Sequence, residues 1–248
     1  MERIVAEHES EVPELKRIGI IGGFGQWASL DIINRILKES VVRIPQYGNR
    51  GYPPMDIRMC NHAPMLLNED GSFPEVLEPS EELLEASRFV GTNSDFIILL
   101  ANTPHLFANQ VEEAAGKPLL SIVDVTVEEA VKRNCKRVGV MAIGPTLERG
   151  LYQNPLEASG IEVIPLPKDL SERLDNEAIY PVQEGANPTS VHKAGYDIVS
   201  YFERQKVDRI ILGCTELPIL LQGYSESSHV LNPSQLLAIA VVEKSLRR

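Results

Sequence analysis

Short runs of apolar residues, each long enough for one buried strand, recur along the chain and alternate with stretches of helical periodicity. These runs predict strands at residues 17–22, 56–60, 95–100, 119–124, 137–142, 161–166, 209–213 and 229–232. Strands that alternate with helices form parallel sheets that are covered on both faces. The pattern therefore predicts an α/β fold.

Two pairs of segments repeat in the same order. "KRIGIIGGFG" begins at Lys16 and "KRVGVMAIGP" at Lys136, while "DFIILLANTPH" begins at Asp95 and "DRIILGCTELP" at Asp208, so the offsets are 120 and 113 residues. One pair of Ile- and Val-rich strands would carry little weight, but two ordered pairs predict two α/β subdomains of similar topology with a cleft between them. The expected parts are an N-terminal extension (1–16), a first subdomain (17–125), a second subdomain (126–225) and a C-terminal strand and helix (226–248) that packs back on the first subdomain.

Other signals predict a helix and two loops. Pro79 and Ser80 precede an acidic first turn and an apolar spacing, which is typical of a capped surface helix. The proline-containing stretches 43–56 and 179–190 are predicted to be long loops near strand ends, where loops often border a site.

Composition and charge exclude several classes of protein. The chain has 248 residues, 43% of them hydrophobic, and a net charge of −11, which argues against nucleic-acid partners because these need clustered Lys and Arg. No apolar run approaches the ~20 residues that cross a bilayer. The acidic start "MERIVAEHESEVPE" lacks the pattern of a signal peptide, so we expect a cytoplasmic protein without a membrane partner.

The three cysteines, Cys60, Cys135 and Cys214, form neither an even disulfide set nor a C-x-x-C pair. Reduced thiols and no metal site are expected. Cys214 directly follows a predicted strand and precedes the helical "TELPILL", a position where the helix dipole would lower the pKa of a thiol. The alternative is a buried structural cysteine, but the polar Thr-Glu that follows favours a functional role.

Ligands of α/β sheets bind beyond the carboxyl ends of the strands, where "ANT" and "CTE" lie. Asn102, Thr103 and Thr215 offer donors suited to a substrate carboxylate. His105 is interpreted either as a capping residue or as a catalytic one, and Glu216 either as a supporting group or as a residue that favours a helix N-terminus.

Two rival interpretations have other chemistry. Gly23, Gly25 and Ala28 fit the dinucleotide-binding pattern G-x-G-x-x-A, but the second predicted strand ends in Cys60 and lacks the expected acidic residue. A non-catalytic binding protein could equally hold a small carboxylate in a two-lobed cleft.

Several ordered motifs resemble those of the aspartate/glutamate racemase superfamily: "RIGIIGGFG", "ANTPH", "PLLSIVD", "LGCTELP" and "LNPSQLLAIAVV". The resemblance runs from about Lys16 to the C-terminus. It implies two pseudo-symmetric Rossmann-like subdomains with parallel sheets, an active site in the cleft between them, no cofactor such as pyridoxal phosphate, an amino-acid or small carboxylate substrate, and a homodimer.

The resemblance also implies roles for individual residues. Racemases of this superfamily use two cysteines on opposite faces of the α-carbon, and Cys214 corresponds to one of them, while Ala101 stands where the other belongs. The residues expected to bind the substrate are Gly23, Trp27, Asn61, Asn102, Thr103 and Thr215. Trp27 either covers the cleft or packs against the core.

Three explanations for Ala101 remain open at this point. In the first, the chain is a relative with one-sided chemistry, such as decarboxylation, elimination or isomerisation. In the second, another group such as water or His105 replaces the thiol and the enzyme remains a racemase. In the third, Ala101 is an engineered substitution in a racemase. Two-base racemisation is expected to be impaired, because a methyl group can neither give nor take a proton.

A further departure concerns the substrate. Aspartate-specific relatives carry an arginine and a lysine in the segments that read "CNHAPM" and "IYPVQEG" here, and only His62 could supply a positive charge. Because an unpaired buried carboxylate is costly, the sequence predicts poor binding of aspartate or glutamate and a preference for a less acidic, bulkier side chain.

Overall fold

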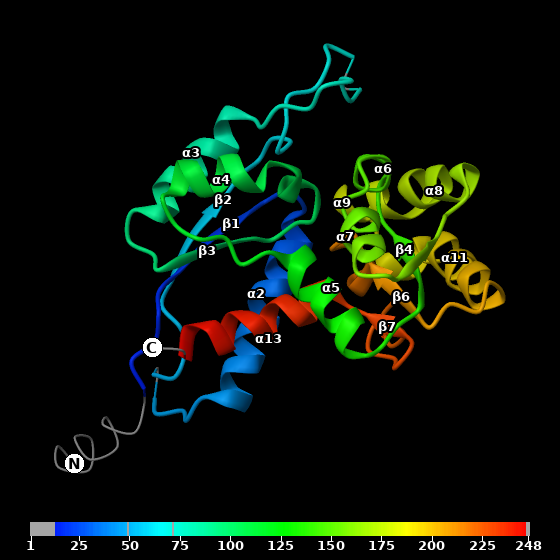
Figure 1. Ribbon diagram of the computed structural model, residues 1–248. Helices are drawn as coiled ribbons and strands as arrows, with labels where there is room; N and C mark the ends of the chain where they lie inside the picture. The colour runs from blue at the N-terminus through cyan, green and yellow to red at the C-terminus, as the bar shows by residue number, and fades with distance from the viewer. Residues whose placement is uncertain (1–12, 49, 71, 247–248) are drawn as a thin grey trace, which may run out of the picture.

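The computed structural model describes residues 13–246 except 49 and 71, and it contains two parallel sheets (Figure 1). The first sheet has the order β2-β1-β3 and the second the order β5-β4-β6-β7. In each sheet the earliest strand is flanked by the next two, so the α/β fold and the repeated topology are confirmed. The strands are β1 (Ile18–Gly22), β2 (Met55–Met59), β3 (Phe96–Leu99), β4 (Arg137–Met141), β5 (Glu162–Ile164), β6 (Arg209–Leu212) and β7 (Val230–Leu231).

Helices cover both sheets. Those that precede β4 are α2 (Gln26–Arg43), α3 (Glu81–Gly91), the 3₁₀ helix η1 (Thr103–Phe107), α4 (Ala108–Ala115) and α5 (Ile122–Lys132). Those that follow β4 are α6 (Gly144–Glu148), α7 (Gln153–Ala158), α8 (Lys168–Leu174), the π-helix η2 (Asp175–Ile179), α9 (Tyr180–Gln183), α10 (Pro188–Val191), α11 (Lys193–Arg204), α12 (Leu217–Leu220) and α13 (Pro233–Leu246). We call the part with β1–β3 the first half and the part with β4–β7 the second half.

The largest hydrophobic core is shared between the halves. Successive residues of a strand face opposite layers, so Ile18 and Ile20 of β1 pack in the same core as Val138 and Val140 of β4, whereas Ile21 faces a separate core that includes residues of α3. Helix α13 packs against α2 and α5 within the shared core (Figure 1). The two sheets are thereby held with their carboxyl ends close to a common crevice.

The predicted strand at 119–124 is wrong. Leu119 makes only an isolated bridge with Ile97, and the Ser121 side chain then accepts a hydrogen bond from the Asp124 N–H and caps α5. A cap of this kind ends an extended run and starts a helix. The helix predicted after Ser80 is confirmed as α3, because the Ser80 side chain accepts from the Leu83 N–H.

The predicted loop at 179–190 is also wrong, because much of this stretch lies in η2, α9 and α10. The C-terminal strand β7 pairs with β6 of the second half and contributes Leu231 to the shared core, and α13 packs against α2. The predicted boundary between residues 125 and 126 falls inside α5, and most of the predicted extension 1–16 lies outside the described residues.

None of the helices in the described part of the chain combines the length and hydropathy that a bilayer crossing requires.

Candidate functional site

A cavity of about 390 Å³ lies between the two halves, at the carboxyl ends of the strands of the first sheet. Three loops of the first half form most of its wall, and the second half contributes Ile143, Tyr180 and Gln183. No Arg, Lys, Asp or Glu is among the described residues that line it. The first-half lining residues are Gly23, Phe24, Gly25, Gln26, Asn61, His62, Ala63, Pro64, Met65, Leu67, Phe73, Ala101, Thr103 and Pro104.

The glycines of the β1–α2 turn are required by close packing. Gly23 has a φ of 96°, and a Cβ there would lie 2.0 Å from the carbonyl oxygen of Cys60. A Cβ at Gly25 would lie 2.0 Å from Oε1 of Glu216. The turn therefore abuts a carboxylate of the second half, and this carboxylate would repel a pyrophosphate group, which argues against the dinucleotide-binding interpretation.

Cys214 does not line the cavity. Its side chain is 6% exposed and packs with the apolar core of the second half, so the prediction that the sulfur lies directly in the cleft is wrong for this structure. Its Sγ donates a hydrogen bond to Oε2 of Glu216 at 3.0 Å. Burial, followed by the charge of Glu216, raises the pKa of the thiol well above its ordinary value.

The predicted lowering of this pKa is therefore wrong as well. Helix α12 begins only at Leu217 and has four residues, so its dipole is weak, and the group nearest to the sulfur is an anion. In this structure Cys214 is a neutral thiol that is hydrogen-bonded to a carboxylate.

Glu216 connects this thiol to the cavity wall. It is 3% exposed, and its Oε1 accepts a hydrogen bond from Nε2 of Gln183 at 3.1 Å, while Oε2 accepts from Cys214. Gln183 and Gly25, which both contact Oε1, line the cavity. The sulfur is thus separated from the cavity by a single hydrogen-bonded carboxylate.

The loop after β3 brings Ala101 and Thr103 into the cavity wall. Thr103 Oγ1 lies 3.0 Å from Thr146 Oγ1 of the second half. Asn102 is buried behind them: its Oδ1 accepts from the hydroxyl of Tyr152 at 2.6 Å, and its Nδ2 has no hydrogen-bond partner among the described residues. A buried amide donor without an acceptor is costly. Asn102 itself is not among the residues that line the cavity.

His105 does not reach the cavity. Its Nδ1 lies 3.0 Å from the carbonyl oxygen of Ala101 and 3.1 Å from that of Asn102, and its Nε2 accepts from the Ile122 N–H. Burial lowers the pKa of the ring to about 4. His105 is therefore a neutral residue that positions the Ala101 loop, and the geometry does not favour it as a replacement acid.

The remaining candidates lie in different places. Trp27 is 62% exposed and lines a separate groove, so it does not cover the cavity. Thr215 is buried, and its hydroxyl donates to Glu216 at 3.4 Å. Asn61 lines the cavity, as does His62, whose Nδ1 is 3.0 Å from the Glu82 carboxylate. His62 thus already has an anionic partner.

No pattern in the sequence pointed to Asp175. This residue begins η2 and is 9% exposed; its Oδ2 accepts from the Gly144 N–H at 3.1 Å, and its Oδ1 has no partner among the described residues. Tyr180, one π-turn later, lines the cavity, so Asp175 lies behind this wall. Burial, together with the charges of Glu148 and Glu172, raises the pKa of Asp175 from 3.8 to about 6.

Asp175→Asn is expected to stabilise the protein selectively at higher pH. Because the folded-state pKa is raised, wild type loses stability as the pH rises from about 4 to about 6, whereas the amide does not titrate. The unfolding free energy of the variant relative to wild type should therefore increase by about 2 kcal/mol between pH 4 and pH 8. Urea titrations at both values test this, with the exposed Asp169→Asn on α8 as the control; an equal difference at both pH values would contradict it.

The comparisons with known proteins point to one family. A family model described as Asp/Glu/Hydantoin racemase matches residues 65–240. The chain is 25% identical over 235 residues to the "Broad specificity amino-acid racemase RacX" of Bacillus subtilis (strain 168), covering 92% of this chain and 98% of the relative.

Solved structures give the same result for the fold. An aspartate racemase homologue from Pyrococcus horikoshii OT3 superimposes with a TM-score of 0.71 and 25% identity, covering 94% of this chain and 100% of that one. The Picrophilus torridus aspartate racemase superimposes with a TM-score of 0.77 and 19% identity, covering 94% and 95%.

Proposed function

Because the chain belongs to the Asp/Glu/Hydantoin racemase family, we propose that it is a cofactor-independent enzyme that moves a proton at the carbon next to a carboxylate, with Cys214 as its proton-transfer group. The observation that carries this proposal is the hydrogen bond between the Cys214 thiol and Glu216, beside a cavity shared by the two halves. A carboxylate in contact with a thiol makes the pair able to accept or deliver a proton.

The substrate carboxylate is proposed to bind Asn102, Thr103 and Thr215. The unpartnered Nδ2 of Asn102 supports this assignment, since a carboxylate oxygen would supply the acceptor that this buried donor lacks. Removal of the α-proton places further negative charge on the carboxylate. Donors fixed before the reaction would stabilise that charge as it develops.

The proton balance involves two groups. As the α-carbon proton passes to Sγ of Cys214, the thiol proton passes to Oε2 of Glu216, and the reverse transfers return a proton to the carbon. Because Cys214 is only 6% exposed, we propose that Gly25 and Gln183 separate slightly from Glu216 when the substrate reaches the sulfur. A small opening between the halves is therefore part of the proposal.

The opposite wall supports one-sided chemistry. Ala101 lines the cavity, and the titratable lining residues of the described chain are His62 and Tyr180, neither of them in the Ala101 loop. His105, the nearest alternative in that loop, is bound to the main chain through both ring nitrogens. We therefore propose that the α-proton is removed and returned on the Cys214 face only, with retained configuration.

The proposed substrate is an amino acid with an apolar side chain. The cavity wall has no described lysine or arginine to pair with a second carboxylate, and Phe24, Met65 and Phe73 offer apolar contact instead. The broad specificity of the Bacillus subtilis relative is in accord with this assignment. Calorimetric titration should give tighter binding of leucine or methionine than of aspartate, and tight aspartate binding would contradict the proposal.

A decarboxylase is the second candidate function. The raised pKa of Cys214 favours a neutral thiol, which suits protonation of the carbanion that remains after loss of carbon dioxide. Release of carbon dioxide from a disubstituted malonate, with no deuterium exchange into any amino acid, would select this candidate.

We also propose that the protein is a cytoplasmic homodimer. Helix α2 exposes Trp27, Leu30, Leu37, Val41 and Val42, and large apolar patches on a surface are typical of subunit contacts. Sedimentation equilibrium at micromolar concentration should give twice the chain mass, and a monomer would contradict the dimer.

A further inference from the structure

A projecting segment between β2 and α3 forms the apolar side of the cavity. We call its described residues, 61–70 and 72–80, the cavity segment. Leu67 and Phe73 line the cavity, and both are 41% exposed, so they stand at its solvent edge. The position of this segment therefore determines how large an apolar group the cavity can hold.

The cavity segment is held together mainly by its own hydrogen bonds. The Leu66 N–H donates to Glu78 at 3.0 Å and the Asn68 N–H to Ser72 at 2.9 Å, while the Ser80 N–H donates to Pro64 at 3.0 Å. These bonds fold the outgoing chain against the returning chain. They do not attach the projecting part to the second half, which forms the other cavity wall.

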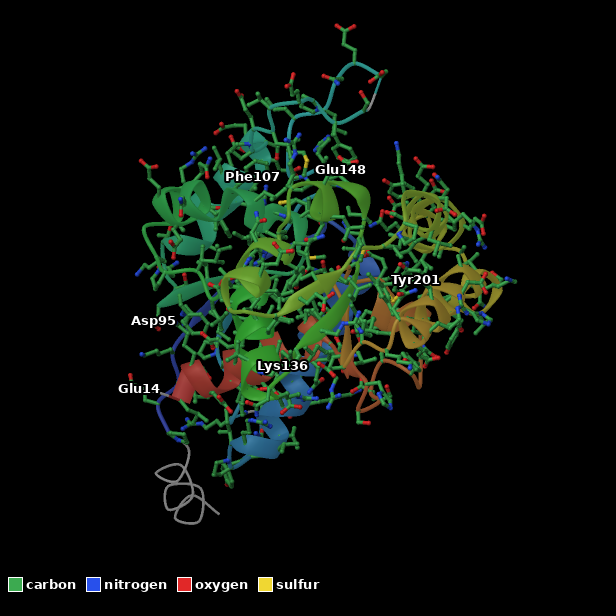
Figure 2. The ribbon with its side chains drawn as sticks, turned by 45° about the vertical axis from the view of Figure 1, so that its right-hand side comes forward. Glu14, Asp95, Phe107, Lys136, Glu148 and Tyr201 are labelled. Carbon is green, nitrogen blue, oxygen red and sulfur yellow. The ribbon has the colours of Figure 1, made fainter. Side chains whose placement is uncertain are left out.

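That attachment comes from one side chain. Arg149 follows α6 in the second half, and its Nη2 donates to the carbonyl oxygens of Glu75 at 2.7 Å and of Pro74 at 3.3 Å. In the described chain, these are the hydrogen bonds that join the cavity segment to the second half. Figure 2, in which Glu148 marks the end of α6, shows this helix beside the base of the projecting segment.

We propose that Arg149 is a positioning residue that sets specificity: it fixes the cavity segment so that Leu67 and Phe73 close over a bulky apolar side chain of the substrate. This inference rests on the proposed function for the substrate class. Phe73 directly precedes Pro74, so a shift of the bound carbonyls moves the Phe73 ring. A guanidinium suits the task because its several N–H groups can bind two acceptors at once.

Arg149→Ala should raise KM for phenylalanine or leucine about three- to tenfold, because the variant loses an exposed charge-assisted hydrogen bond. KM for alanine should change less than twofold. Arg149→Lys should restore part of the loss. The control is Arg133→Ala, an exposed arginine whose side chain binds Glu129 on its own helix. An equal KM change for alanine and phenylalanine would overturn the specificity role.

Hydrogen exchange tests the attachment without any substrate. The hydrogen-bonded amides of Leu66, Asn68 and Ser80 should exchange at least threefold faster in Arg149→Ala than in wild type or Arg133→Ala. Unchanged exchange would overturn the attachment itself. If the wild type turned over no amino acid, but amide hydrogen exchange was still faster in Arg149→Ala, the proposed function would fail and the attachment would stand.

Discussion

Ala101→Cys is expected to convert one-sided exchange into racemisation and to raise the rate of enantiomer interconversion about 10²- to 10⁴-fold. Ala101 lines the cavity in the first half, whereas Cys214 and Glu216 approach it from the second half. A thiol at position 101 would therefore supply an acid on the wall that now presents a methyl group. The rate is measured by chiral chromatography from each pure enantiomer of an apolar amino acid.

The control for this gain is Ala63→Cys, which places a thiol elsewhere in the same cavity wall. It should leave enantiomer interconversion unchanged. Equal gains in both variants would show that any added thiol acts non-specifically. No gain in Ala101→Cys, with the fold intact, would contradict the assignment of position 101 to the face opposite Cys214.

Cys214→Ala is expected to lower the rate of α-proton exchange about 10²- to 10⁴-fold, because it removes the atom that takes the proton. The buried Cys135→Ala also removes a sulfur from a core, but at the junction between α5 and β4, so it should retain exchange. Exchange is followed by NMR in D₂O.

Both cysteine variants need a stability check. Large-to-small changes in a core commonly cost one to several kcal/mol, about 1–3 for a side chain of this size. Comparable melting temperatures for the two variants, together with loss of exchange in Cys214→Ala alone, would identify the sulfur as the reacting group. Retained exchange in a folded Cys214→Ala would refute its role.

Most strands could be predicted from the sequence because buried parallel strands are continuous apolar runs of fixed length. The strand predicted at 119–124 does not form. Leu119 makes an isolated bridge with Ile97, and Ser121 then caps a helix. The helices within 179–190 were missed because Pro181, Gly185 and Pro188 favour turns locally, whereas packing of Ile179 and Val182 in the second-half core favours helix.

Only part of the candidate site could be predicted from the sequence. The rule that ligands bind beyond the carboxyl ends of strands placed Ala101 and Thr103 at the cavity, because it depends on topology alone, and the family resemblance added Gly23. The same rule placed Cys214 and Thr215 there, and neither lines the cavity. The environment of Cys214 could not be predicted, since its pKa depends on how deeply it is buried and on where the Glu216 side chain turns. Trp27 and Asp175 were likewise placed by tertiary packing, which no local pattern encodes.

The proposal that one sulfur moves the proton on one face is tested most directly by the stereochemistry of exchange in the wild-type protein. A pure enantiomer of leucine or methionine is incubated in D₂O, and both the deuterium at the α-carbon and the configuration are followed. The expected result is deuterium incorporation with configuration retained. Deuterium that enters with immediate loss of configuration would reveal a second acid, and it would contradict single-sided chemistry at Cys214.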